Sequence, residues 1–373
     1  MKNKKILIFA NFRYPGGDPL VISKLTQKLS KRGYDFVIMA PIENDCRSLI
    51  KECRWIKEFI PYKYSSNAQK KISNYLRKNC PDLFLISGSA PFALEAACTF
   101  KRPAISRIIG HPKWWINPMG GEQIKAHDLI RLIGAFSDRI ISVSGFINRV
   151  FKQAGVKHIQ TIHEGCDTSL FYPSQSEKIE FRKEFKLSKD TIVFGVFANF
   201  TWQKQHHHVL EALLRYQKIN LNFKCFFFGG STNRDMFYRK NELINMAQKM
   251  GLANHLICAG FRKDIRTAMN GTDIALFPFL EEAFGMALVE SMACEIPVIV
   301  NDSGSFPEIV TSGKEGLVVK THLPALFSKA IHALTSNRQK MLRMGKNGRK
   351  KVMSHFSFEQ HVDAYDKLFR ELI

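Results

Sequence analysis

Short apolar runs that end at turn residues alternate along this chain with segments whose apolar residues follow helical spacing. The apolar runs predict buried strands, and the segments with helical spacing predict helices that cover them. This alternation is typical of open parallel sheets in an α/β protein, and it occurs in both halves of the chain. Strands are expected at Ile6–Ala10, Asp35–Ala40, Pro81–Ile86, Pro103–Ile109, Ile192–Ala198, Lys224–Phe228, Leu256–Gly260 and Ile274–Phe277.

The most informative stretch is Phe277–Val319, where a loop and an apolar helix at Met286–Cys294 follow a buried strand. Ligands of such sheets bind beyond the carboxyl ends of the strands. Gly285 precedes the helix and allows close approach of the backbone. The first helical amides, at Met286 and Ala287, have no acceptor within the helix and form an anion site that fits a diphosphate.

Two carboxylates flank this turn. Glu282 precedes the helix and Glu290 lies about two turns along it, so both could face one cleft with phosphates on the amides between them. Carboxylates accept hydrogen bonds from hydroxyl groups, and a sugar and a ribose are therefore natural partners. The alternative is an ordinary amphipathic helix in an α/β core, but the unusual Phe284-Gly285 turn favours a binding site.

The string E-x-F-G-x-x-x-x-E, followed by A-C-x-x-P-V and G-S-x-P-E, resembles the donor site of family-4 retaining glycosyltransferases of the GT-B fold, also called glycosyl transferases group 1. The resemblance implies two Rossmann-like α/β domains whose parallel sheets face a central cleft. It assigns residues 1–173 to an N-terminal acceptor domain and 174–355 to a nucleotide-sugar donor domain. Residues 356–373 would form a C-terminal helix that crosses back to the first domain.

The same resemblance implies the reaction and assigns roles to residues outside this stretch. A sugar would pass from a nucleoside-diphosphate sugar to an acceptor hydroxyl with retention of configuration. A Gly-Gly pair after the first strand approaches the donor phosphate in this family, and a later histidine lies near the reacting sugar, for which His111 or else Arg107 is the candidate. The expected catalytic residues are Glu282, Lys204 and His111, and the expected donor-binding residues are Gly16, Gly17, Asn199, Lys204, Phe261, Arg262, Glu282, Phe284, Gly285, Met286, Ala287 and Glu290.

Several of these residues have distinct expected tasks. Glu282 would bind sugar hydroxyls, Glu290 the ribose, and the backbone at Phe261-Arg262 the base. Lys204 matches a lysine that clamps the diphosphate, whereas Asn199 replaces the arginine that usually accompanies it. No bound metal or other cofactor is expected, because amides and Lys204 would neutralise the leaving group.

Other positions depart from the family pattern or have open readings. Glu164 stands where asparagine is usual. Glu295 stands where a glycine usually ends the helix, so it must either avoid the left-handed conformation or tolerate it at a cost on the order of 1 kcal/mol. The polar segment Gln175–Lys189 is expected to be a linker. His206–His208 are expected on a helix surface, since three consecutive helical residues cannot all ligate one ion.

The composition is that of a globular protein with a strong positive charge. The formal net charge is +22, and residues 1–173 hold 27 basic and 13 acidic residues, a net charge of +14. This balance predicts an anionic partner such as a nucleotide or a phospholipid surface.

Eight cysteines without a C-x-x-C pair indicate reduced thiols in the cytoplasm. The apolar run Ile6–Ala10 is too short for a signal peptide, and no run is long enough for a transmembrane helix.

The predictions of the acceptor and of the cellular location rest on the basic region 44–80. In this region lysines and arginines alternate with Trp55, Phe59, Tyr62 and Tyr64. It reads either as a patch that holds the protein at the inner face of the cytoplasmic membrane, or as a solvated helix face plus a strand. The first reading fits a lipid-linked acceptor or an envelope glycan such as lipopolysaccharide or capsule.

Three other functions are compatible with parts of the sequence. A nucleotide-sugar epimerase or a phosphorylase could share the fold, but neither accounts as well for the E-x-F-G string. A non-catalytic polyanion-binding protein would use the charge, although no nucleic-acid-binding motif is found and nucleic acid is not expected as a partner. A dinucleotide-dependent oxidoreductase is disfavoured because no G-x-G-x-x-G follows the first strand.

Overall fold

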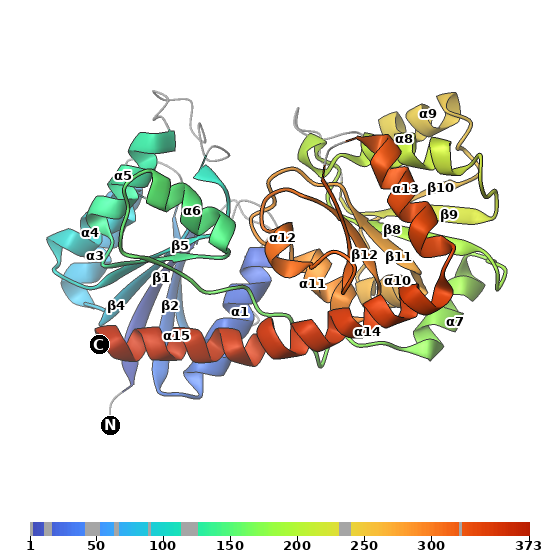
Figure 1. Ribbon diagram of the computed structural model, residues 1–373. Helices are drawn as coiled ribbons and strands as arrows, with labels where there is room; N and C mark the ends of the chain where they lie inside the picture. Colours follow the sequence, from blue (N-terminus) through green and yellow to red (C-terminus); the bar gives the residue numbers. More distant parts are fainter. Residues whose placement is uncertain are drawn as a thin grey trace. The chain divides into compact units, whose positions relative to one another are not determined.

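The computed structural model of this 373-residue chain describes residues 3–10, 17–41, 53–62, 67–88, 91–112, 126–230, 240–320 and 323–373. The chain divides into two compact units, one made of Met1–Gly165 with Glu359–Ile373 and the other of Cys166–Phe358. Each unit is built on one parallel sheet with helices packed against it (Figure 1). The sequence prediction of two Rossmann-like α/β folds is therefore confirmed.

The first unit holds a seven-stranded sheet in the order β3-β2-β1-β4-β5-β6-β7, with parallel neighbours throughout. All residues of β4 and β5 are buried, which fits the apolar run that begins β4, whereas β5 also buries Ser106 and Arg107. Strand order reverses between β1 and β4, so this is the point where ligands of such sheets bind. The strands are β1 (Lys4–Ala10), β2 (Tyr34–Pro41), β3 (Ile56–Tyr62), β4 (Leu83–Ser87), β5 (Ala104–Ile108), β6 (Arg139–Ser142) and β7 (Ile159–Thr161).

The second unit holds a six-stranded parallel sheet in the order β10-β9-β8-β11-β12-β13. Here the strand order reverses between β8 and β11. Aromatic side chains dominate the core around β9, where Phe226 stacks with Phe228 at 5.7 Å between ring centroids. The strands are β8 (Ile192–Phe197), β9 (Phe223–Phe228), β10 (Leu256–Gly260), β11 (Ile274–Phe277), β12 (Val298–Asn301) and β13 (Gly316–Val319).

Helices connect successive strands and cover the sheets. In the first unit they are α1 (Gly17–Ser30), α3 (Asn67–Lys78), α4 (Pro91–Thr99), α5 (Ala126–Phe136) and α6 (Gly145–Gln153). In the second unit they are α7 (Gln175–Glu184), η2 (Trp202–Lys204), α8 (His206–Tyr216), α9 (Lys240–Lys249), α10 (Ile265–Gly271), α11 (Met286–Ala293), α12 (Phe306–Ile309), α13 (Pro324–Thr335) and α14 (Arg338–His355).

The last helix, α15 (Phe358–Leu372), contributes Glu359 onward to the first unit. Its buried residues recur at helical spacing and include Val362, Tyr365 and Phe369. Asp366 anchors it by accepting a hydrogen bond from the Tyr34 hydroxyl at 2.9 Å. The chain therefore returns to its first unit after completing the second.

The segment expected to be a linker is largely a helix, so that prediction is wrong. Helix α7 covers Gln175–Glu184, and the Ser174 side chain caps its first turn by accepting from the Glu177 amide. Two aromatic residues hold it to the sheet: Phe181 is fully buried, and the Phe185 ring lies 4.7 Å from that of Phe226. Tertiary packing of these two rings outweighs the polar composition of the segment.

The expectation of a surface position for the three histidines is wrong for His206. This residue begins α8 and is fully buried, with its ring 4.9 Å from Phe227 and 5.2 Å from Phe200. Burial lowers the pKa of His206 to about 3, so it is neutral in the folded protein. His206 is therefore a core residue, although the three consecutive polar residues in the sequence predicted a position on the surface.

The described part of the basic region contains strand β3 and helix α3, as the reading of a solvated helix face plus a strand expects. In α3, Ile72 and Leu76 are buried and the lysines face solvent, as in an ordinary amphipathic helix. Tyr62 is fully buried and stacks on Phe9 at 5.0 Å, so it is not available to a lipid headgroup. Arg54 and Lys57 remain exposed, whereas Tyr64 lies outside the described residues.

Candidate functional site

The candidate donor site lies at the carboxyl edge of the second sheet, where β8 and β11 are neighbours. The loop after β8 and the loop after β11 are joined there, because the Leu280 amide donates to the Gln203 carbonyl at 2.9 Å. Two tight backbone positions shape these loops, Gln205 with φ +50° and Glu281 with φ +49°. Such left-handed residues are costly and persist where the surrounding structure fixes them, often at functional sites.

An ion pair between Lys204 and Glu282 occupies the centre of this edge. Lys204 ends the short helix η2, and its ammonium nitrogen also lies 4.4 Å from the centre of the Phe279 ring. Both side chains are partly exposed, at 25% for Lys204 and 19% for Glu282, so a ligand can reach them. The arrangement places one cation and one hydroxyl acceptor side by side.

Helix α11 begins beside this pair. Gly285 caps it with φ +95°, a conformation that favours glycine, and a Cβ there would lie 2.8 Å from the Phe306 ring. Because a helix leaves its first amides without internal acceptors, Met286 and Ala287 present two N–H groups at this end. Phe284 is buried under the turn, and its carbonyl accepts from the Ser305 hydroxyl at 2.8 Å.

The loop from Glu281 to Gly285 is held firmly by the segment after β12. The Ser305 amide donates to the Glu282 carbonyl at 3.0 Å, and the Glu281 amide donates to the Ser303 hydroxyl at 2.9 Å. Gly304 has φ +64° and lies so close that a Cβ would overlap the Glu282 backbone. The G-S-x-P-E motif therefore positions the carboxylate of Glu282.

Glu290 and Glu295 lie further along the same helix and at its end. Glu290 is half-buried, and its charge helps burial to raise the pKa of the Cys294 thiol to about 12. Glu295 has φ +60°, so of the two alternatives open for this position it adopts the left-handed conformation. The helix itself ends one residue earlier than expected, at Ala293.

The remaining donor candidates of this unit differ in how their side chains are engaged. Asn199 follows β8, and its side-chain oxygen accepts from the Gly230 amide at 3.1 Å. Phe261 is 77% exposed. The Arg262 guanidinium is held by Glu184 at 2.7 and 3.0 Å and by Asp264, so this side chain is already engaged within the protein.

The candidates of the first unit are less completely described. Gly16 lies outside the described residues, and Gly17 is the first residue of α1. His111 follows β5, and its ring lies 5.8 Å from that of Phe146. Because the two units are described separately, these residues are not placed relative to Lys204 and Glu282.

The first unit contains a buried cluster of charged residues. The sequence singled out Arg107 and Glu164 separately but did not predict their contact. Arg107 on β5 has a side-chain exposure of 1% and forms ion pairs with Asp18, in the first turn of α1, and with Glu164, the latter at 2.5 Å. It also donates to the Ser87 hydroxyl at 2.8 Å. Burial opposes the charged form, but Asp18 and Glu164 outweigh it and raise the pKa of Arg107 above its ordinary value.

Helix α15 closes this cluster. The Nε2 atom of His361 lies 3.9 Å from the Glu164 carboxylate, and its Nδ1 atom is 2.7 Å from the His163 carbonyl oxygen. Burial lowers the pKa of His361 and raises that of Tyr365 above its ordinary value. The departure from asparagine at Glu164 was the one signal in the sequence, since a buried carboxylate requires a cation.

Within the described residues, the side chains and helices bear on metal binding and on membrane insertion. Within them, no group of three or more His, Cys, Asp or Glu side chains is placed to hold a metal ion. None of the helices in the described part is long and apolar enough to cross a membrane.

Comparison with known proteins connects this geometry to a family. Residues 177–351 match the family model described as Glycosyl transferases group 1. The lipopolysaccharide core biosynthesis mannosyltransferase LpsB of Rhizobium meliloti is 25% identical over 63% of this chain and 66% of its own length. An uncharacterized glycosyltransferase of Methanocaldococcus jannaschii is 25% identical over 97% of this chain and 96% of its own length.

A solved structure shows that the fold is shared over the whole length. HepE of Anabaena, determined in complex with UDP and glucose, superposes with a TM-score of 0.84 at 19% identity. The match covers 99% of this chain and 100% of that one. At this level of identity the likeness establishes the two-Rossmann GT-B fold and leaves the ligand of this chain to separate argument.

Proposed function

We propose that this chain, of which residues 177–351 match the family model of glycosyl transferases group 1, transfers a sugar from a nucleoside-diphosphate sugar to an acceptor hydroxyl with retention of configuration. The observation that carries the proposal is the Lys204–Glu282 pair beside the first turn of α11. It combines a cation, free helical amides and a carboxylate within one rigid loop system.

Each of these groups suits one part of a nucleotide sugar. The diphosphate would sit on the amides of Met286 and Ala287, with Lys204 contributing a second, mobile positive charge. Charge on the leaving diphosphate grows in the transition state, so these donors stabilise it more than the bound substrate. Glu282 would accept hydrogen bonds from sugar hydroxyls, and Glu290 from the ribose.

The reaction as proposed needs no bound metal or other cofactor. Amides and Lys204 take the place that a divalent cation has in other nucleotide-sugar enzymes. His111 would act near the reacting carbon, and Gly16 and Gly17 would approach the donor phosphate from the first unit. These three assignments rest on the family pattern.

The acceptor proposed is an envelope glycan or a lipid-linked sugar at the inner membrane face. LpsB is named for lipopolysaccharide core biosynthesis, which supports this class of acceptor. Exposed cations of the first unit, including Arg54, Lys57, Lys70 and Lys71, would be attracted to anionic lipids by about 1 kcal/mol each. Sedimentation with anionic and neutral vesicles at low and high salt tests the membrane part separately.

The central test is a ligand screen followed by product analysis. We expect one of UDP, GDP and ADP to raise the melting temperature of the protein, since a ligand that binds the folded state stabilises it. With the matching nucleotide sugar and an acceptor, nucleoside diphosphate should be released. NMR of the glycosylated product should show the same anomeric configuration as in the donor, because the proposed transfer retains it. If heparin binds but no nucleotide binds at millimolar concentration, the transferase proposal is wrong and the chain is better described as a polyanion-binding protein.

A further inference from the structure

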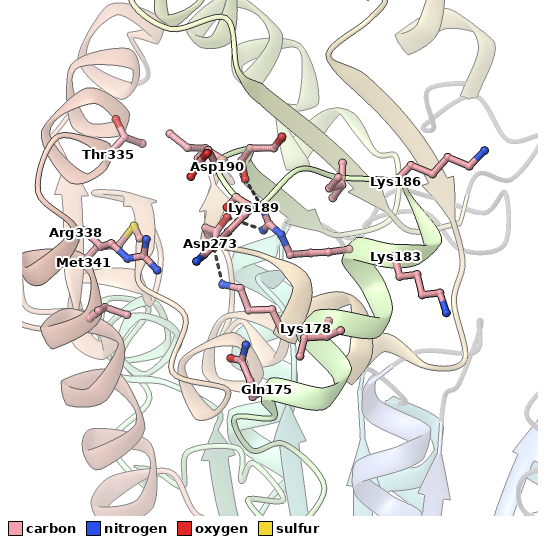
Figure 2. A pocket seen from close by; sticks show the side chains of 16 residues that line it. Gln175, Lys178, Lys183, Lys186, Lys189, Asp190, Asp273, Thr335, Arg338 and Met341 are labelled. Atoms are coloured by element: carbon pink, nitrogen blue, oxygen red, sulfur yellow. Dashed lines mark hydrogen bonds and ion pairs between the residues drawn. The ribbon is translucent and has the colours of Figure 1, made fainter.

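A second cavity of the second unit lies away from the candidate donor site. It has a volume of about 900 Å³ and opens between α7, the turn that follows α7, and the start of α14 (Figure 2). Ile192, the first residue of β8, and Asp273, immediately before β11, are part of its lining. The cavity is therefore at the amino-terminal edge of the parallel sheet, whereas the donor site is at the carboxyl edge.

Internal ion pairs fix the inner wall of this cavity. Asp273 accepts from the Lys178 ammonium at 2.7 Å and from the Val193 amide at 3.0 Å. Arg182 donates to the carbonyl oxygens of Thr191 at 2.6 Å and Ser188 at 2.7 Å, and it lies 3.4 Å from Asp273. The two innermost cations are thus already satisfied, and the wall is preformed.

Apolar side chains line the rest of the cavity and are unusually open to solvent. Ile179 on α7 is 59% exposed and Leu342 on α14 is 54% exposed, and Leu187, Ile192 and Met341 also belong to the lining. A neighbouring cavity of about 360 Å³, lined also by residues 294–297, shares lining residues with this one, including Met341 and Leu342, so the two cavities adjoin at the start of α14. Exposed apolar surface of this kind marks interaction sites.

Positive charges border the apolar lining. Within the part of the chain that the structure describes, Lys183, Lys186, Lys189 and Arg338 have no carboxylate partner. Figure 2 shows the side chains of Lys183 on α7 and of Lys186 in the turn after it extending away from the centre of the cavity. Cations that diverge in this way do not enclose a small anion, but they can meet acidic groups spread along an extended partner.

We propose that this groove, defined by α7, residues 185–191 and the first turns of α14, docks an acidic amphipathic helix of a partner protein. The apolar stripe of such a helix would cover Ile179 and Leu342, and its carboxylates would meet the cationic rim. A planar bilayer does not fill a concave groove. A second copy of this chain is disfavoured because its net charge is +22.

Fluorescence anisotropy with a designed peptide tests this proposal on the full-length protein. The probe is a fluorescein-labelled peptide of about 16 residues with leucine at helical spacing and glutamate at most other positions. Its matched control is a scrambled peptide of the same composition. Two protein variants address the groove, Leu342→Ser for the apolar lining and Lys183→Glu/Lys186→Glu for the rim, with Leu323→Ser and Lys249→Glu as controls at exposed positions elsewhere.

We expect the amphipathic peptide to bind at least about tenfold more tightly than the scrambled one, and each groove variant to weaken it about tenfold. The control variants should bind it as the wild type does. Equal binding of both peptides, or unchanged affinity of both groove variants, would overturn the proposal. Displacement of the probe by inorganic phosphate would identify an anion site instead, and displacement by phosphatidylglycerol vesicles that the groove variants abolish would identify a lipid surface. Both results would also overturn it.

Discussion

Lys204 and Glu282, 78 residues apart in the chain, form an ion pair at the carboxyl edge of the second sheet. Each is supplied by a different loop, one after β8 and the other after β11, and the hydrogen bond from Leu280 to Gln203 joins the two loops. The carboxylate of Glu282 is therefore the partner of the lysine in this structure. A diphosphate would compete for the same ammonium group, so donor binding and the state of this pair are linked.

Lys204→Ala should reduce the rate of transfer by about two to three orders of magnitude. The reason is that the lysine faces charge that grows on the leaving diphosphate, and Asn199 supplies no second cation. Affinity for the nucleotide sugar should fall much less. Steady-state kinetics with calorimetric binding measures both, and Lys249→Ala on α9 is the matched control. A variant with near-normal kcat would remove Lys204 from the reaction.

Glu282→Gln should impair transfer yet keep or increase affinity for the bare nucleoside diphosphate. The amide still fits the loop, but it releases Lys204 from its ion pair and weakens the contacts to sugar hydroxyls. Calorimetric titration with the diphosphate and with its sugar gives the two affinities. If both fall equally, Glu282 serves the nucleotide and not the sugar.

Much of the fold could be predicted from the sequence because buried parallel strands are nearly uniform in composition. The stretch from Phe277 to Val319 also revealed its turn and helix, since Gly285 and the apolar run that follows have few structural alternatives. The helix α7 and the core position of His206 could not be predicted in the same way. Both depend on aromatic partners distant in sequence, such as Phe226 and Phe227.

The sequence predicted the candidate site better in the second unit than in the first. Glu282 and Gly285 share one local motif, whereas the contact between Glu282 and Lys204 depends on the adjacency of β8 and β11. The partners of Arg107 are farther apart still, at Asp18 and Glu164, and only the folded sheet brings them together. Charge clusters of this kind leave no periodic pattern in a sequence.

Arg107→Met should destabilise the protein by about 3–5 kcal/mol, because it leaves the carboxylates of Asp18 and Glu164 buried without a cation. The triple variant Arg107→Met/Asp18→Asn/Glu164→Gln should recover most of this loss. Thermal and chemical unfolding measure the free energies. Arg139→Met, an exposed arginine on the neighbouring strand, should change stability by less than about 0.5 kcal/mol. A triple variant as unstable as the single one would show that packing, and not charge, dominates.

Two glycines on α14 should respond in opposite ways to alanine. At Gly345 a Cβ would overlap the Glu295 carbonyl oxygen, which belongs to the left-handed end of α11, so Gly345→Ala should cost about 1–3 kcal/mol. At Gly348 the nearest atom is a Met292 side-chain carbon at 3.4 Å. Gly348→Ala should therefore be neutral or stabilise the helix by up to about 1 kcal/mol. Melting temperatures that fall equally would contradict the close approach at Gly345.

Acid should destabilise the second unit through His206. Burial lowers the pKa of this histidine from an unfolded value of 6.5 to about 3, so between these values only the unfolded state takes up the proton. The contribution is absent above pH 6.5 and grows as the pH falls, by about 1.4 kcal/mol per pH unit, which gives about 2.8 kcal/mol at pH 4.5.

His206→Leu removes this term and should flatten the pH dependence, even though lost packing lowers its stability at pH 7. Chemical unfolding followed by circular dichroism at pH 7.0 and 4.5 compares the slopes of variant and wild type. His332→Gln changes an exposed histidine on α13 and should keep the wild-type slope. If the His206→Leu slope equals that of the wild type, the histidine is hydrated or already protonated in the folded protein, and acid acts through other groups.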